Sequence, residues 1–183
     1  MTLYINCCPR SNSRTMWLAE KLLNKLGRYE EVNLEKENLS PLNRERLEYR
    51  TELIAKNDFS DPIFKYAKQF AAADTIVIAA PYWDLSFPSK LKIYIENIYV
   101  TGIVSRYSEE GKPQGMCKAK TLYYVTTAGG PYDGRYSFEY IKDLAENFLG
   151  IDKAVLIKAE MLDVRKNDAE KILEECVTFY HLD

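Results

Sequence analysis

The sequence predicts an α/β fold in which a five-stranded parallel sheet is covered by helices on both faces. Short apolar segments rich in β-branched residues alternate along the chain with segments whose apolar residues recur at helical spacing. One strand segment, 75–80, is apolar throughout, which is typical of a parallel strand buried on both faces. Strands and helices in alternation are joined by right-handed crossovers, which bring the strands into one parallel sheet.

The first half of the chain contains three of the expected strands, over 2–6, 30–34 and 75–80. The helix after the first strand begins at the capping residue Ser13 and ends at Gly27. Its apolar face consists of Ala19, Leu22, Leu23 and Leu26. The charged segment 44–56 is a possible surface helix with little apolar face, and Pro62 favours the start of a helix over 62–72.

The second half contains the two remaining strands, over 120–127 and 154–159. A helix over 89–99 carries its apolar side chains on one face, and the polar segment 102–115 is an excursion from the α/β pattern. A further helix around Ile141 ends at Gly150. For the last helix we expect a capping box formed by Asn167 and Glu170.

Five strands with this spacing fit a flavodoxin-like three-layer sandwich with strand order 2-1-3-4-5. In such a sheet a ligand binds outside the carboxyl ends of the strands, at the switch point beside the first and third strands. The loops that follow the first, third and fourth strands are 7–13, 81–88 and 127–135. We therefore expect the functional site among these three loops.

The composition limits the class of protein. A length of 183 residues is typical of one domain, so we expect residues 1–183 to form a single domain whose core needs no disulfide or metal. The net charge of −2 argues against nucleic-acid binding through bulk positive charge. No apolar run approaches the ~18 residues of a membrane span, and the four cysteines lack disulfide or zinc spacing. We therefore expect a cytoplasmic protein with reduced thiols and no membrane partner.

The only histidine is His181, close to the end of the chain. A mechanism that requires an internal histidine is therefore excluded, such as a Ser-His-Asp or Cys-His hydrolase, and so is a histidine-ligated metal site. The 14 tyrosines and seven phenylalanines instead indicate aromatic surfaces that pack against a ligand or against other parts of the protein.

The first of the three loops suits a phosphate group. Helix N-termini carry free N–H groups and partial positive charge, and Ser11, Asn12 and Ser13 add polar donors just before the helix. Either Arg10 or Arg14 can add charge-assisted hydrogen bonds. An ordinary capped helix with solvated arginines is the structural alternative.

The same loop also matches a second pattern, the Cys-x5-Arg-[Ser/Thr] signature of tyrosine phosphatases, through Cys8, Arg14 and Thr15. A thiolate at a helix N-terminus has a lowered pKa. Low-molecular-weight phosphatases also need an acid in an Asp-Pro-aromatic loop late in the chain. Here the only Asp-Pro pair is at 61–62, in mid-chain.

The second loop is rich in aromatic and apolar side chains, with Tyr82, Trp83, Leu85 and Phe87 directly after a buried strand. Such a surface is unfavourable in water, so a flat apolar ligand or a subunit interface covers it well. Packing into the core of the subunit is the alternative.

Several motifs follow one another in a fixed order. A strand ends in Ala80-Pro81 before the aromatic loop, and Leu-Lys-x-Tyr-Ile (91–95) and Gly-x-x-x-x-Tyr (102–107) come after it. Ser-x-Ser occurs at 11–13 and Thr-x-Gly-Gly at 127–130. In this order the motifs resemble those of the flavodoxin-like FMN-dependent NADH-azoreductase / NAD(P)H:quinone oxidoreductase family.

The resemblance implies non-covalent FMN and a binding site for it. The loop 11–13 would hold the phosphate, the loop 82–85 would lie along the isoalloxazine, and 127–130 would line the other edge of the ring. The implied cofactor-binding residues are Cys8, Ser11, Asn12, Ser13, Pro81, Tyr82, Trp83, Asp84, Leu85, Thr127, Ala128, Gly129, Gly130 and Tyr132. Because FMN carries the chemistry, no catalytic side chain and no metal are expected.

Three positions depart from the residues usual in that family. Cys8 stands where a serine is frequent, Asp84 where many members have asparagine, and Ala128 where arginine is common. These departures concern phosphate affinity, flavin potential and substrate range.

The resemblance further implies a two-step, ping-pong cycle. NADH or NADPH transfers a hydride to FMN, and a quinone or azo compound then takes two electrons from the same flavin face. It also implies a homodimer with the site between the subunits, so the helix over 89–99 would belong to the interface in place of the core. Phe87, Tyr94 and the excursion 102–115 are candidates for the pocket wall. A flavodoxin-type electron carrier, and the phosphatase using Cys8 and Arg14, stay as alternatives.

Overall fold

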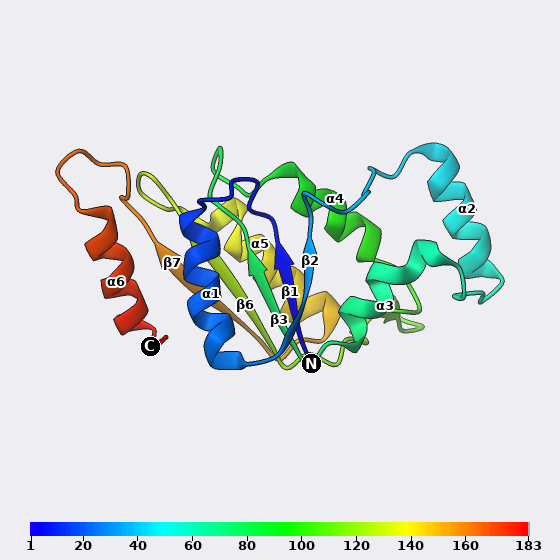
Figure 1. The fold of residues 1–183 in the computed structure, drawn as a ribbon. Coiled ribbons are helices and arrows are strands. Elements are labelled where there is room, and N and C mark those ends of the chain that lie inside the picture. The colour runs from blue at the N-terminus through cyan, green and yellow to red at the C-terminus, as the bar shows by residue number, and fades with distance from the viewer. Residues whose placement is uncertain (183) are drawn as a thin grey trace.

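The computed structural model describes residues 1–182, and its five parallel strands follow the predicted order. They are hydrogen-bonded in the sequence β2-β1-β3-β6-β7 (Figure 1), which corresponds to 2-1-3-4-5. The bounds are β1 (Thr2–Asn6), β2 (Tyr29–Asn33), β3 (Thr75–Ala79), β6 (Thr121–Thr127) and β7 (Lys153–Ala159). Each end of an observed strand lies within one residue of the predicted end.

Helices cover both faces of the sheet (Figure 1). One face packs against α1 (Arg14–Leu26) and α6 (Ala169–Phe179), and the other packs against α3 (Lys65–Ala72), α4 (Ser89–Ile98) and α5 (Phe138–Leu144). Alternate residues of β1 separate accordingly, since side chains of a strand point to opposite faces. Leu3 and Ile5 join the α3–α5 side, and Tyr4 joins the α1–α6 side.

The ends of α1 confirm the sequence prediction. The Ser13 side chain accepts a hydrogen bond from the Met16 backbone N–H, and Gly27 ends the helix with a φ of 84°. The capping box predicted for α6 is wrong. Asp168 is the N-cap and accepts from the backbone of the first turn, whereas the Asn167 side chain donates to the Met161 carbonyl.

Two predicted helices contain tighter or wider turns. The segment that begins at Pro62 opens with the 3-10 turn η1 (Pro62–Phe64) before α3, and α5 continues into the π-helical turn η3 (Ala145–Leu149). Gly150 ends this turn in the left-handed region, as the stop at Gly150 predicted. The helix α2 (Arg44–Ala55) buries no side chain, which confirms the surface helix.

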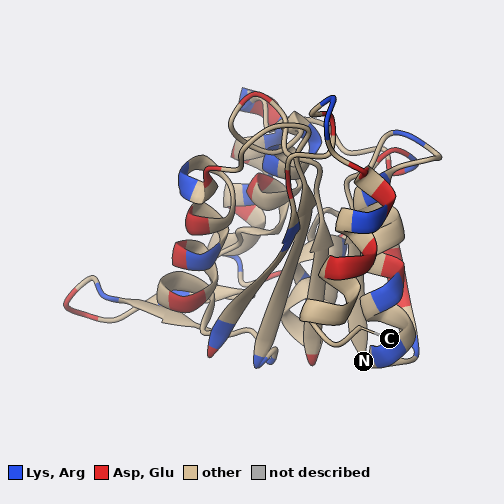
Figure 2. Cartoon of the chain, turned by 90° about the vertical axis from the view of Figure 1, so that its left-hand side faces the viewer, with Lys and Arg blue, Asp and Glu red and all other residues tan. Residues whose placement is uncertain are grey.

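The excursion 102–115 contains an antiparallel hairpin of β4 (Ser105–Tyr107) and β5 (Pro113–Gly115), which its polar sequence did not reveal. It follows α4 and precedes β6, so it lies at the amino edge of the sheet and projects outward at the left of Figure 2. The Cys117 N–H, just after β5, donates to the Leu149 carbonyl. The excursion 102–115, a candidate for the pocket wall, therefore lies at the edge of the subunit opposite the three predicted site loops.

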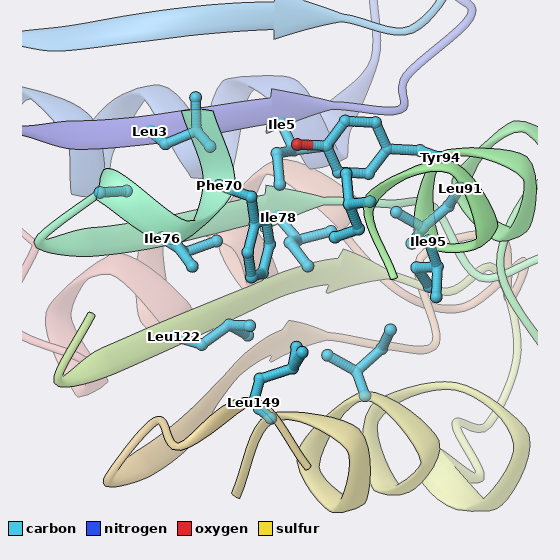
Figure 3. Close-up of a cluster of buried hydrophobic side chains, with 14 of the residues drawn as sticks. Leu3, Ile5, Phe70, Ile76, Ile78, Leu91, Tyr94, Ile95, Leu122 and Leu149 are labelled. Atoms are coloured by element: carbon cyan, nitrogen blue, oxygen red, sulfur yellow. The ribbon is translucent and has the colours of Figure 1, made fainter. Parts of the chain in front are cut away.

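The apolar face of α4 belongs to the core. Leu91, Tyr94 and Ile95 pack with Phe70 and Ile78 between α4 and the sheet (Figure 3). Tyr94 is only 1% exposed, so it forms neither a pocket wall nor a subunit interface. Within residues 1–182, no helix is long and apolar enough to cross a lipid bilayer.

Candidate functional site

Loops at the carboxyl edge of the sheet meet around a polar cavity of about 510 Å³. The switch point between β1 and β3 predicts this location. Loops after β1, β3, β6 and β7 all contribute to its wall. The lining residues are Pro9, Arg10, Asn12, Ser13, Arg14, Thr15, Pro81, Tyr82, Trp83, Thr127, Gly129 and Asp163.

One end of the cavity is suited to an anion. It lies at the N-terminus of α1, where the first backbone N–H groups have no partner within the helix. Ser13 caps the helix as an acceptor, and its hydroxyl hydrogen can still donate to a ligand. Thr15 and Thr127 share a buried hydroxyl–hydroxyl hydrogen bond of 2.6 Å, which fixes α1 against the end of β6.

The other end is a flat aromatic wall. Pro81 is buried, and the Tyr82 N–H donates to the Thr127 carbonyl at 3.1 Å. The Tyr82 ring packs edge-on against Tyr132 with 4.8 Å between centroids. Trp83 is 39% exposed and also lines the cavity. The contacts of Tyr82 with Thr127 and Tyr132 hold this loop in place, and its aromatic side chains face the cavity.

The aromatic loop continues into a tight turn whose backbone is strained. Trp83 and Ser86 exchange two backbone hydrogen bonds, of 3.0 and 2.8 Å. Between them, Asp84 and Leu85 have φ angles of 48° and 66°, in the left-handed region that L-residues avoid at a cost of roughly 1–2 kcal/mol each. Leu85 is 61% exposed, so burial does not compensate for its strain.

A fourth loop, after β7, completes the site. It runs along the loop after β6: the backbone N–H groups of Met161, Leu162 and Asp163 donate to the carbonyls of 130, 128 and 129, respectively. The carboxylate of Asp163 reaches the cavity and accepts from Arg14 at 2.8 Å. Asp163 lies outside the three loops that the sequence predicts for the site, although the loop after β7 emerges at the same edge of the parallel sheet.

The structure brings many of the predicted residues together, but not all of them line the cavity. Those that do are Asn12, Ser13, Pro81, Tyr82, Trp83, Thr127 and Gly129. Ser11 lines a neighbouring groove between α1 and α6. The remaining ones belong to the same loops without lining the cavity: Cys8, Asp84, Leu85, Ala128, Gly130 and Tyr132. Phe87 lines a separate aromatic hollow with Tyr136 and Tyr140.

Cys8 does not fit the phosphatase alternative. Its side chain is buried and its Sγ contacts the Ala79 carbonyl at 3.6 Å. Burial raises the pKa of this thiol to about 11, so it is protonated at neutral pH and is not the nucleophile that the signature requires. Arg14 is held by Asp163.

Known proteins resemble this chain over nearly its whole length. A family model described as a flavodoxin-like fold matches residues 1–181. The FMN-dependent NADH:quinone oxidoreductase 2 of Clostridium acetobutylicum is 35% identical, covering 96% of this chain and 93% of its own. The FMN-dependent NADH:quinone oxidoreductase of Clostridium beijerinckii is 36% identical with the same coverage.

Solved structures share the fold. An azoreductase from Bacillus anthracis str. Sterne superposes with a TM-score of 0.82 at 22% identity, covering 97% of this chain and 95% of its own. An FMN-dependent NADH-azoreductase from Bacillus anthracis str. Ames Ancestor, solved in complex with FMN, has a TM-score of 0.81 at 24% identity, covering 97% and 94%.

Proposed function

The chain belongs to the flavodoxin-like family that includes the FMN-dependent NADH:quinone oxidoreductases, and from this we propose that it transfers two electrons from NADH, or NADPH, through bound FMN to a quinone or an azo compound. The observation that carries this proposal is the cavity at the switch point of the sheet. It combines an anion-binding end with a flat aromatic wall, which suits a phosphorylated ligand with a planar ring.

The residues present fit FMN. The phosphate would bind at the N-terminus of α1 with the hydroxyl of Ser13 and the amide of Asn12, and with the hydroxyl of Ser11 from the adjoining groove, which shares Asn12, Ser13 and Arg14 with the cavity. The ring would lie along 82–85 with its other edge at 127–130. Bound FMN supplies the two-electron chemistry. The protein supplies position: the Thr15–Thr127 hydrogen bond fixes the phosphate end, and the anchored aromatic loop shields one side of the ring site from water.

We also propose a homodimer with the site at the interface. Large apolar side chains remain exposed beside the cavity, namely Trp83, Leu85, Tyr136 and Tyr140. Clustered apolar surface next to a ligand site is typical of a surface that a partner covers. A cytoplasmic location fits the four free cysteines, since reduced thiols persist there.

The test uses the purified protein. We expect non-covalent FMN, bleaching of its absorbance by NADH, and NADH-dependent reduction of menadione without hydrolysis of p-nitrophenyl phosphate. A protein that neither contains nor takes up FMN contradicts the proposal. If the protein binds FMN but neither NADH nor NADPH reduces it, the flavodoxin-type electron carrier is the remaining alternative.

The phosphate end has its own test. Ser11→Ala combined with Ser13→Ala should weaken FMN retention, because two hydroxyl donors are lost. Ser108→Ala, in the hairpin loop at the amino edge, is the matched control. Unchanged FMN affinity in the double variant would place the phosphate elsewhere.

A further inference from the structure

We propose that Asp163 is a positioning residue that holds Arg14 in place as a ligand of the cofactor phosphate, so that this carboxylate strengthens the binding of an anion. The inference rests on the proposed function. Asp163 and Arg14 come from the two ends of the chain, and both line the cavity.

The geometry fixes the Arg14 guanidinium at the anion-binding end. Arg14 is the first residue of α1. Its Nη2 donates to Asp163 Oδ1 at 2.8 Å, and its Nη1 donates to the Leu162 carbonyl at 3.3 Å. A guanidinium carries five N–H donors in one plane, so two acceptors on the β7 loop leave further donors for a phosphate. A fixed guanidinium loses less side-chain entropy when it binds the phosphate than a free one does.

The backbone of Asp163 is fixed against the loop after β6. Its backbone N–H donates to the Gly129 carbonyl at 2.8 Å. Its carboxylate lies directly against Gly129, where a Cβ would stand 2.1 Å from Oδ2 and 2.9 Å from Cγ. A glycine at 129 is therefore needed for the carboxylate to reach Arg14. This gives Gly129 a role distinct from close approach of the flavin.

The charges predict that removing the negative charge of Asp163 has opposite effects on FMN affinity in the presence and in the absence of Arg14. By itself, a carboxylate beside a phosphate repels it. Through its charge-assisted hydrogen bond with Arg14, the Asp163 carboxylate instead holds a positive charge at the phosphate site. With Arg14 present, removing the charge of Asp163 should weaken FMN binding. With Arg14 absent, the carboxylate is an unpaired negative charge at the phosphate site, and removing its charge should strengthen FMN binding.

The experiment measures dissociation constants of the apoprotein for FMN and for riboflavin, which lacks the phosphate. Asp163→Asn should weaken FMN binding by about tenfold, and Arg14→Met by about thirtyfold, whereas riboflavin binding should stay within about twofold of wild type. The double variant should bind FMN more tightly than Arg14→Met alone. Asp152→Asn, which removes the exposed Lys120–Asp152 ion pair at the amino edge, is the matched control and should bind both flavins as wild type does.

Each other result overturns the inference. An Asp163→Asn variant that binds FMN more tightly would show that the carboxylate competes with phosphate for Arg14. Equal losses for FMN and riboflavin, or additive losses in the double variant, would make the pair merely structural. If the Asn variant does not fold, Asp163→Ser repeats the test. Wild-type apoprotein that binds no FMN defeats the proposed function as well, whereas wild-type binding with unchanged variants defeats only the role of Asp163.

Discussion

The two edges of the sheet are built by different means. At the carboxyl edge, loops meet through backbone hydrogen bonds and also through side chains such as Arg14 and Asp163, and non-glycine residues with positive φ occur at Asp84, Leu85 and Met161. At the amino edge, the backbone of the β4–β5 hairpin packs directly on the backbone at the end of η3, where a Cβ at Gly115 would lie 2.0 Å from the Gly150 nitrogen. The comparison indicates that the carboxyl edge keeps adjustable side-chain contacts and a strained turn beside a ligand site, whereas close backbone packing at the amino edge fixes the fold.

The largest expected effect concerns Gly115→Ala at the amino edge. The new Cβ would meet the Gly150 nitrogen and, at 2.1 Å, the Leu149 carbonyl carbon. Backbone atoms cannot rotate away as side chains do, so we expect the free energy of unfolding to fall by about 3 kcal/mol. Urea denaturation measures it.

Gly111→Ala is the matched control within the same hairpin. Gly111 has a φ of 74°, and no atom lies within 4 Å of the place where an alanine methyl group would stand. Its substitution therefore costs only the left-handed conformation, about 1 kcal/mol. Equal losses in the two variants would mean that the contact with Gly150 contributes nothing.

The second prediction places the same substitution at the carboxyl edge, as Gly129→Ala. Here the methyl group meets the Asp163 carboxylate, an exposed side chain that can move aside. Unfolding should change by less than about 1 kcal/mol, while FMN affinity should fall by about tenfold as Asp163 releases Arg14. A stability loss as large as that of Gly115→Ala, with unchanged FMN affinity, would remove the distinction between the two edges.

Sequence reasoning recovered the parts of the fold that depend on local chemistry. Ser13 and Gly27 act as caps on α1 because each does so through its own conformation and nearest neighbours. Topology alone predicted the carboxyl edge as the site. The sequence could not predict whether Asn167 or Asp168 caps α6, since both residue types are good N-caps. The Asn167 side chain instead donates to the Met161 carbonyl of the preceding loop, and Asp168 caps the helix.

The features that the sequence did not predict depend on contacts between residues far apart in the chain. An apolar helical stripe looks the same whether a sheet or a second subunit covers it, so the burial of Tyr94 needed the packing of α4 on β1 and β3. Asp163 carries no motif, and its place in the site depends on the alignment of the β7 loop with the loop after β6.

The third prediction concerns Cys8, which lies at the carboxyl edge yet is buried like a core residue. Burial raises the pKa of its thiol from 9.0 to about 11, so the native chain keeps a proton that the unfolded chain releases. Its contribution to stability is complete below pH 9 and is lost as pH rises from 9 to 11.

Cys8→Ser should therefore reduce the decline in unfolding free energy by about 1 kcal/mol per pH unit in that window. Below pH 8 the curves of the variant and the wild type should run parallel. Urea titrations between pH 7 and 11 measure both. If unfolding free energy falls with pH at the same slope in the variant and the wild type above pH 9, the Cys8 thiol titrates as it does in water and is accessible to solvent.

The smallest expected effect tests the strain at the carboxyl edge, through Leu85. Leu85→Gly removes the cost of the left-handed backbone, roughly 1–2 kcal/mol, but adds the conformational entropy of glycine, about 0.5–1 kcal/mol. Because the side chain is mostly exposed, little burial is lost, and we expect a net gain of about 0.5 kcal/mol in unfolding free energy. Leu85→Ala keeps the strained φ and should show no gain, so the pair separates backbone from side chain. If thermal melts instead show the same shift for both variants, the backbone of this turn stores no strain. The edge would then differ from the amino edge in its contacts alone.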